Sequence, residues 1–398
     1  MASWGAGGEG RSGWGRSPEW WGTQGGGWGR DAGVDVYVGE SAAGNGHVCV
    51  TSHACDEGSR GDRGETMQWR VLRFNGETRQ SVVCVGAQSG VAESGTVAFE
   101  YVKGMIAGGL AMGKAVGMAR PRKRVLCLGL GGGTLPMFFA QGHHRAGQEG
   151  DAEVHAVELD PVVVEAAMAA MGLDQGLVKV HVQDAGDFAK TWAGEKFDLV
   201  FLDCFGGDDG VPDALVDPEG PLCAALRGGT LLAAPGVLVV NQHGGLPPPG
   251  LAERVTRRFG PGYDPVDGGA HGRKVHRTME SLVGALAGAA GGVGNVAAVT
   301  AACQSQDNVL LLAARLGPDG AAAPRGLAAA TVNEVAASAT SEMSPPCAPV
   351  PAPAGLVACL GDAADAAQPP GLSFALRPRA IRGLHLLSPP VVRAVADP

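Results

Sequence analysis

Glycine and acidic residues stand directly after four successive apolar runs of the sequence. The first run leads into the segment GLGGGTLP, which begins at Gly129, and the next three runs are followed by Glu158, Asp184 and Asp203. Glycines let a ligand approach the backbone at a turn into a helix, where free N–H groups and the positive end of the helix dipole gather. The spacing therefore predicts a nucleotide-type site. Its backbone side would consist of Gly129, Gly131 and Gly133.

The acidic residues have separate expected roles. A carboxylate at Glu158, after the second run, can accept hydrogen bonds from both hydroxyls of a ribose. Asp184, in the segment QDAGDF, offers a carboxylate to an adenine amino group. Asp203 would lie at the centre of the cleft, where a partly buried carboxylate can bind an alkylammonium group and accept its proton. Asp203 could instead only orient an acceptor or cap the following turn, and Asp160 fits the N-cap of a helix beginning at Pro161 equally well.

Several other nucleotide or hydrolase chemistries lack the residues that they need. A nicotinamide dehydrogenase requires G-x-G-x-x-G, but Thr134 stands at the third glycine position, and acids after the third and fourth runs are not part of that fingerprint. No G-x-S-x-G elbow or P-loop surrounds an apolar run, so the motifs give no support for a hydrolase or an NTPase. His243, after the fifth run, either lines an acceptor pocket or is an ordinary loop histidine.

The elements that position these residues alternate between apolar strands and helical segments from Arg124 to Arg315. Continuous apolar strands of this kind predict an α/β, doubly wound and mostly parallel sheet that is covered on both faces. In such sheets ligands bind outside the carboxyl ends of the strands, where the glycines and acids stand. The seven expected strands are VLCLGL, VHAVEL, VKVHV, FDLVFLD, GVLVVNQ, AAVTAAC and NVLLLAA.

A small β-rich module is expected in front of this sheet. The alternating run Met67–Phe74, the turn dipeptide Asn75-Gly76 and the β-branched run Arg79–Val85 predict a hairpin, and a helix is expected from about Thr96 to Met118.

The same module contains four residue types that can bind zinc: His47, Cys49, His53 and Cys55. A strand period of two also accounts for their spacing, so we expect no metal site.

These motifs together resemble a known family. Gln80 in a strand, Phe99-Glu100-Tyr101 opening a helix, and then G-x-G-G-G, VELDP, QDAGDF and LDCF are similar to the spermidine synthase-like branch of the S-adenosylmethionine-dependent methyltransferase superfamily, and to its relatives that methylate protein lysines and N-termini. The resemblance spans residues 67–315 and implies a Rossmann-like sheet of seven strands. It also implies S-adenosylmethionine, or its decarboxylated form, as the donor, with Asp203 in the place of the general base. The donor contacts that it implies are Gln80, Gly129, Gly131, Gly133, Glu158 and Asp184.

Two departures from the family pattern decide the expected reaction. Spermidine synthases usually carry G-G-G-D-G at the first turn and D-x-x-D-P after the fourth strand, whereas this sequence has Thr134 and Gly206 at the two acidic positions. The amine-binding acid is therefore missing or replaced by Asp208 or Asp209. We expect methyl transfer to an unidentified amine, on a small molecule or a protein. The alternatives are aminopropyl transfer to a polyamine and a non-catalytic binding module with the same fold.

Composition limits the compartment and the partners. Glycine accounts for 65 of the 398 residues and proline for 26, so part of the chain is expected to remain unpacked. A net charge of −9 argues against broad contact with nucleic acid or an anionic membrane. Nine cysteines without a C-x-x-C motif favour a reducing, cytoplasmic compartment. A homodimer is the expected assembly.

The chain is expected to have four parts. Residues 1–33 are a glycine- and tryptophan-rich disordered tail, and residues 34–118 form the β-rich module that ends in a helix. Residues 119–316 form the S-adenosylmethionine-binding domain. Residues 317–398 are an alanine- and proline-rich low-complexity tail.

Overall fold

The structure is a computed structural model, in which two β-sheets and their helices account for most of the described residues. These residues are 33–55, 64–75, 78–118, 123–145, 152–206, 210–243, 270–290, 296–302 and 308–317. The two predicted tails lie almost entirely outside them, since only residue 33 of the first and residue 317 of the second are described.

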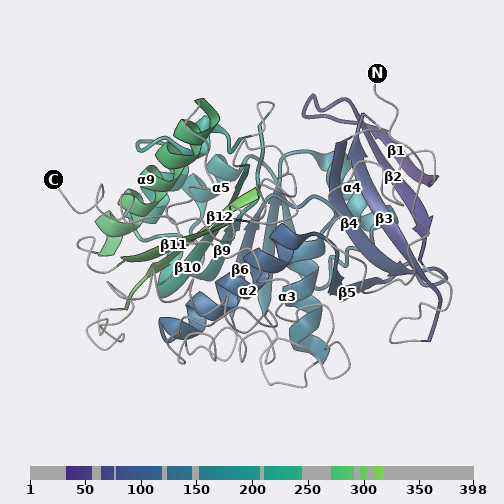
Figure 1. Cartoon of the computed structure of the whole chain (residues 1–398), viewed down its shortest axis with the longest axis horizontal. Coiled ribbons are helices and arrows are strands. Elements are labelled where there is room, and N and C mark those ends of the chain that lie inside the picture. Colours follow the sequence, from purple (N-terminus) through teal and green to yellow (C-terminus); the bar gives the residue numbers. More distant parts are fainter. Residues whose placement is uncertain are drawn as a thin grey trace, which may run out of the picture.

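The larger sheet has seven strands in the order β11-β12-β10-β9-β6-β7-β8. The strands from β11 to β6 are labelled in Figure 1. The strands from β10 to β8 pair in parallel, whereas β12 is antiparallel to both of its neighbours. Each apolar run predicted as a strand lies in one of these strands. Their bounds are β6 (Arg124–Leu128), β7 (Glu153–Glu158), β8 (Val178–Val182), β9 (Phe197–Leu202), β10 (Leu232–His243), β11 (Val296–Ala302) and β12 (Asn308–Arg315).

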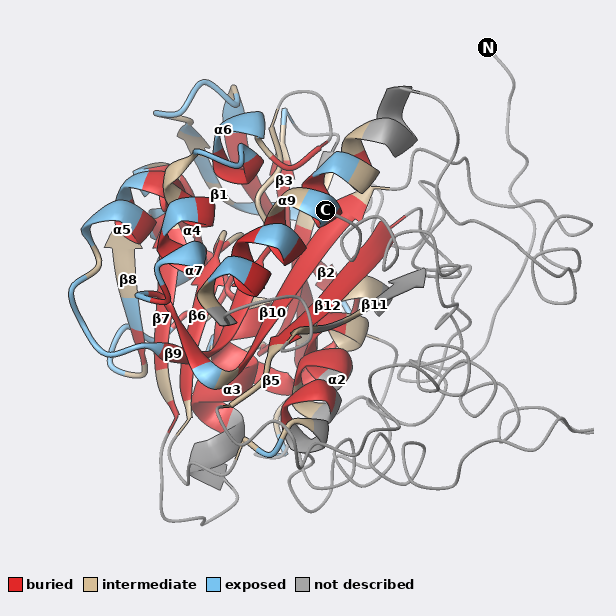
Figure 2. Cartoon of the chain, turned by 90° about the vertical axis from the view of Figure 1, so that its left-hand side faces the viewer, coloured by how far each residue is buried: buried red, intermediate tan, exposed pale blue. Residues whose placement is uncertain are grey.

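Helices cover both faces of this sheet. Alternate residues of β6 belong to two separate hydrophobic cores, with Val125 and Cys127 in one and Leu126 and Leu128 in the other. The central strands are consequently buried along their length, and exposed residues lie on the outer sides of the helices (Figure 2). The first core includes α2 (Glu100–Ala115), α3 (Thr134–Arg145) and α4 (Pro161–Ala170); the second includes α5 (Ala185–Thr191), α6 (Asp213–Val216), α7 (Pro221–Arg227) and α9 (Ala270–Ala290).

The smaller sheet is formed by five antiparallel strands in chain order. The predicted hairpin is present as β3 and β4, and Asn75 in its turn has a φ of 51°. The predicted start of the following helix is wrong, because Thr96 and Val97 end a strand and the helix begins at Glu100. The strands are β1 (Val34–Glu40), β2 (His47–Ala54), β3 (Met67–Phe74), β4 (Thr78–Gly86) and β5 (Ala92–Val97).

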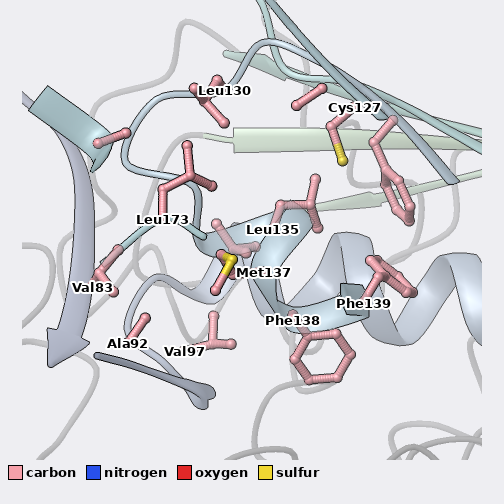
Figure 3. Close-up of a cluster of buried hydrophobic side chains, with 14 of the residues drawn as sticks. Val83, Ala92, Val97, Cys127, Leu130, Leu135, Met137, Phe138, Phe139 and Leu173 are labelled. Carbon is pink, nitrogen blue, oxygen red and sulfur yellow. The ribbon is translucent and has the colours of Figure 1, made fainter. Parts of the chain in front are cut away.

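The two sheets share one hydrophobic core. Val83, Ala92 and Val97 from the smaller sheet pack in the same cluster as Leu135 and Met137 of α3 (Figure 3). Apolar residues that are fully buried between the two units contribute to the stability of both. The smaller sheet is therefore packed onto the larger unit along β4 and β5.

Asp160 provides a second, polar connection between the two units. Its Oδ1 accepts a hydrogen bond from the Val162 backbone N–H at 2.9 Å, which caps α4. The same side chain accepts hydrogen bonds from the Ser41 hydroxyl and from the Ala42 N–H, both in the turn between β1 and β2. Asp160 is fully buried, so its role here is structural.

Candidate functional site

The glycine-rich loop at residues 129–133 joins β6 to α3. Gly129, Gly131 and Gly133 have φ values of 95°, 52° and 82°, which glycine adopts far more readily than other residues. A Cβ atom at Gly129 would collide with the backbone carbonyl of Asp203, and one at Gly131 would lie 3.5 Å from the Ser81 Cβ. The loop is therefore held between the end of β9 and the middle of β4.

Thr134, at the first position of α3, fastens this loop to β4. Its hydroxyl donates a hydrogen bond to the Val82 carbonyl at 3.2 Å and lies 3.3 Å from the Ser81 hydroxyl. In the sequence Thr134 was notable only as a departure from two motifs. The structure gives the side chain a positioning role that depends on a strand about fifty residues away.

Gln80 lies at an irregularity of β4, next to Ser81. Leu72 of β3 pairs with Ser81 and Arg73 pairs with Arg79, so Gln80 has no cross-strand partner in the ladder. A bulge of this kind bends the strand and redirects a side chain, and bulges are frequent beside active sites. Gln80 is half-buried and adjacent to Ser81, which contacts the glycine loop. Gln80 therefore stays a candidate residue for contact with S-adenosylmethionine.

Glu158, the last residue of β7, is connected to the same loop. Its Oε2 accepts hydrogen bonds from the N–H groups of Leu130 at 3.1 Å and Gly131 at 3.4 Å, and its Oε1 accepts one from Asp160 at 3.1 Å. Burial raises the pKa of the Glu158 carboxyl, and these backbone hydrogen bonds oppose that rise. The carboxylate is thus held at the edge of the loop.

Asp184, after β8, is exposed and caps α5. Its Oδ1 accepts hydrogen bonds from the N–H groups of Gly186 at 2.7 Å and Asp187 at 3.1 Å. Among the described residues all hydrogen bonds of this carboxylate go to Oδ1. A ligand amino group could therefore bind Oδ2 without breaking the cap.

Two large apolar side chains are exposed beside these acids. Leu159 follows Glu158 and is 57% exposed, and Val182 at the end of β8 is 51% exposed. Glu158 pairs with Val182 across the parallel ladder, so both side chains belong to the carboxyl edge of the sheet. Neither residue was predicted from the sequence, although a bulky apolar residue directly after a strand-end acid is a signal that the sequence contains. Exposed apolar surface at this edge suits the face of a planar ring.

Asp203 follows β9 at the centre of the edge and is half-buried. Its backbone N–H donates to the Leu128 carbonyl at 2.8 Å, and its Oδ1 accepts a hydrogen bond from the Asn241 amide nitrogen at 2.8 Å. Burial raises the pKa of the Asp203 carboxyl, while the Asn241 hydrogen bond and the positive charge of His243 lower it. Asn241 was not assigned a role from the sequence.

The charges at the strand ends act on one thiol. Cys204 lies next to Asp203, and burial raises the pKa of its thiol well above the ordinary value. The negative charges of Glu158, Asp203 and Asp184 add to this rise. The structure therefore brings the three predicted acids together at one edge of the sheet.

His243, at the end of β10, faces an aromatic ring. Its ring centre lies 4.5 Å from that of Phe205, with the planes tilted by 45°. Both side chains are half-buried beside Asp203, so they could form part of the wall of an acceptor pocket. Asp208 and Asp209, the alternative amine-binding acids, lie outside the described residues.

The possible zinc ligands of the small sheet have other partners. His47 forms an ion pair with Glu40 at 3.0 Å, and His53 Nε2 lies 2.8 Å from the Thr51 hydroxyl. Within the described ranges no group of three or more histidine, cysteine or acidic side chains is arranged to hold a metal ion. The helices in these ranges also include none with the length and apolar character needed to span a bilayer.

Curated relatives match part of the chain. No family model matches it. A polyamine aminopropyltransferase from Vibrio vulnificus is 28% identical over 180 residues, which are 44% of this chain and 54% of the relative. The mouse eEF1A lysine and N-terminal methyltransferase is 30% identical over 127 residues, 30% of this chain and 17% of that protein. The chain resembles the spermidine synthase-like branch of the S-adenosylmethionine-dependent methyltransferase superfamily. It spans about half the length of the aminopropyltransferase and less of the methyltransferase.

Two solved structures that match the chain are described by partial coverage and low sequence identity. A probable spermidine synthase from Corynebacterium glutamicum matches with a TM-score of 0.44 and 19% identity, covering 70% of this chain and 79% of that one. Human methyltransferase-like protein 13, solved in complex with SAH, matches with a TM-score of 0.36 and 20% identity, covering 56% and 84% of the two chains.

Proposed function

We propose that this chain is an S-adenosylmethionine-dependent transferase that methylates an amine of a small molecule or a protein. The observation that carries the proposal is the convergence of the glycine-rich loop, Glu158 and Asp203 at the carboxyl edge of the larger sheet. In this proposal residues 119–316 form a doubly wound, methyltransferase-type domain that binds the donor. Residues 34–118 form the module that covers one side of the site.

The nucleoside half of the donor would lie along the ends of β7 and β8. Glu158 would accept hydrogen bonds from the ribose hydroxyls, and Asp184 Oδ2 would accept one from the adenine amino group. Leu159 and Val182 would lose their exposed surface against the adenine ring, which contributes favourably at about 25 cal/mol per Å² of apolar area. Asp184 Oδ2 has no hydrogen bond among the described residues, and Leu159 and Val182 are exposed. Glu158 already accepts backbone N–H groups at both oxygens, so hydrogen bonds from a ribose would add to these bonds or replace them.

The amino-acid half of the donor would face the start of α3. Backbone N–H groups of a glycine loop and the positive end of a helix dipole favour an anion. The side chain at this position is the neutral Thr134, so no acid of the loop repels the α-carboxylate of S-adenosylmethionine. Decarboxylated S-adenosylmethionine lacks that carboxylate and would gain nothing from these groups. This difference favours methyl transfer over aminopropyl transfer.

Asp203 would assist the transfer itself. The acceptor amine uses its nitrogen lone pair to attack the methyl carbon, the carbon–sulfur bond breaks, and its electrons stay on sulfur to leave S-adenosylhomocysteine. An alkylammonium has a reference pKa near 10.4, so it must lose a proton first. The Asp203 carboxylate can bind the ammonium and receive that proton, and burial supports this because it raises the pKa of the carboxyl.

Aminopropyl transfer to a polyamine is the second candidate, because the relative from Vibrio vulnificus is named as an aminopropyltransferase. The acceptor class is an amine in both cases, since the relatives from mouse and cattle are named as lysine and N-terminal methyltransferases. A cytoplasmic location and a homodimer remain predictions, which cell fractionation and light scattering would test.

The test is to identify the nucleoside product. The full chain is incubated with S-adenosylmethionine or its decarboxylated form, together with putrescine, spermidine or a cell extract, and the products are resolved by mass. S-adenosylhomocysteine formed by the wild type and not by Asp203→Asn would support the proposal. Methylthioadenosine formed only with putrescine would reverse the ranking. Absence of binding by either donor in calorimetry would leave the non-catalytic module as the remaining interpretation.

A further inference from the structure

Two buried asparagines connect β12 to the carboxylate of Asp203. Asn308, the first residue of β12, donates from its amide nitrogen to the Asn241 side-chain oxygen at 2.9 Å. Asn241, near the end of β10, donates from its own amide nitrogen to Asp203 Oδ1 at 2.8 Å. Asn308 is 5% exposed and Asn241 is 1% exposed, so water has little access to these bonds.

The direction of this chain of hydrogen bonds is set at its Asp203 end. An ionised carboxylate can only accept, so Asn241 must present its NH2 group to Asp203. The Asn241 oxygen then points the other way and needs a donor, which Asn308 supplies. A buried polar network whose members are all satisfied is rigid, because any flip leaves a donor or acceptor unpaired.

We propose that Asn308 is a positioning residue: it fixes the Asn241 amide so that its NH2 group, and not its oxygen, faces Asp203. The proposal rests on the proposed function of Asp203 as the group that binds and deprotonates the acceptor amine. It assigns to the first residue of β12 a role in a reaction whose other candidate residues lie in β4 or follow β6, β7, β8 and β9.

The surroundings of Asp203 make this orientation consequential. From β10 the positive charge of His243 favours the ionised carboxylate, whereas the thiols of Cys127 on β6 and Cys204 have raised pKa values and stay neutral. Within the described part of the chain, Asn241 is the group that donates a hydrogen bond to the Asp203 side chain. If the Asn241 oxygen faced Asp203 instead, it would repel the carboxylate and raise the pKa of the carboxyl further.

The experiment measures the titration of Asp203 directly. Carbon-13 NMR of aspartate-labelled protein follows the side-chain carboxyl from pH 3 to pH 9, and Asp203→Asn assigns its signal. Asn308→Leu replaces the hydrogen-bonding amide of Asn308 with an apolar group of similar size. We expect the pKa of the Asp203 carboxyl to rise by about one pH unit, which is the size expected for the loss of one oriented hydrogen bond to a charge. Affinity for S-adenosylmethionine should stay within about twofold of the wild type, since its proposed binding site does not include the hydrogen bond between Asn308 and Asn241.

Gln242→Leu is the matched control. Gln242 is also a buried amide of β10, next to Asn241 but on the opposite face of the strand. Its Nε2 has no hydrogen-bond partner among the residues that the structure describes. Gln242→Leu should leave the pKa of the Asp203 carboxyl at its wild-type value. If Asn308→Leu fails to fold, Asn308→Asp is used instead, because it also lacks the amide N–H group. It should raise the pKa of Asp203 at least as much as Asn308→Leu.

An unshifted Asp203 in a folded Asn308 variant would overturn the proposal. Equal shifts in Asn308→Leu and Gln242→Leu would overturn it as well, because they would indicate a general disturbance of β10. The NMR titration needs neither donor nor acceptor, so a failure of the proposed function is seen separately in the donor-binding and product assays. With an acceptor in hand, the acid limb of kcat/KM should move to higher pH in the same variant.

Discussion

The backbone carbonyl of Asp203 occupies the place that a Cβ atom at Gly129 would take. This close approach joins the end of β6 to the end of β9, and it puts the candidate proton acceptor directly beside the loop that would hold the donor. Gly129 also has a φ of 95°, so two separate requirements for glycine coincide at this position.

Gly129→Ala should therefore lower both stability and donor binding. We expect a loss of more than about 2 kcal/mol in the free energy of unfolding, because backbone strain and a collision with the backbone add. Gly117→Ala is the control, since Gly117 has a φ of 73° but open space around its Cβ position. Urea unfolding and calorimetry with S-adenosylmethionine measure the two effects. Equal losses in the two variants would remove the close approach from the explanation.

Glu158→Gln should weaken S-adenosylmethionine binding by about 1 to 3 kcal/mol, through the loss of charge-assisted hydrogen bonds to the ribose. Far-ultraviolet circular dichroism should show an intact fold. Glu280→Gln, on the exposed surface of α9, should bind the donor like the wild type. Undiminished affinity in folded Glu158→Gln would exclude this carboxylate from the site.

Leu159→Ala tests the apolar edge. The side chain is 57% exposed, so its truncation should change the free energy of unfolding by less than about 0.5 kcal/mol. If an adenine ring covers it, donor affinity should fall by about 1 kcal/mol. Met168→Ala, on the neighbouring α4 and 38% exposed, should not affect affinity. A similar affinity for both variants and the wild type would contradict the assigned adenine position.

Thr134→Asp tests the donor preference. An acid at the start of α3 should repel the α-carboxylate of S-adenosylmethionine, so we expect affinity for this donor to fall at least about tenfold. The decarboxylated donor should lose less. Thr134→Val removes the hydroxyl without adding charge and separates the two effects. If both donors weaken equally in Thr134→Asp and Thr134→Val, the charge at this position does not select the donor.

Stability should depend on pH through a cluster between β7 and β8. Glu153 Oε1 lies 2.6 Å from the Lys179 amine and 3.0 Å from His155 Nε2, and these bonds lower the pKa of Glu153 to about 2. This contribution is complete above the unfolded value near 4.5 and is lost as the pH falls towards 2. Burial lowers the pKa of His155, so the unfolded chain binds a proton first, and stability should already fall below about pH 6.5.

Denaturant unfolding between pH 8 and pH 3 checks this dependence. Glu153→Gln should flatten the curve below about pH 5, and His155→Gln should flatten it between about pH 6.5 and pH 5. Parallel pH curves for the wild type and both variants would contradict the assignment.

The sequence predicted the strands, and the position of the acids at the strand ends, because both signals are local. Each apolar run carries its own strand signal, and Glu158, Asp184 and Asp203 follow directly from the ends of such runs. Parallel strands align their carboxyl ends, so the convergence of these acids needed no tertiary information.

Contacts between distant segments could not be predicted in the same way. Asn308 and Asn241 are separated by the whole of α9 and β11, and nothing in their local sequence links them to Asp203. The same holds for Ser81 and Thr134, which meet because the smaller sheet packs against α3. The start of α2 was misplaced for a local reason, since Thr96 and Val97 favour a strand and form one.

Asp160 stands two residues beyond Glu158, and it holds the turn between β1 and β2 while capping α4. The first pair of strands therefore cannot lift away from the larger unit without breaking the hydrogen bonds from Ser41 and Ala42 to Asp160, which stands close to Glu158. At this corner the small sheet is held in a fixed position against the larger unit. If the proposed function holds, a donor would have to enter and leave the site away from this corner.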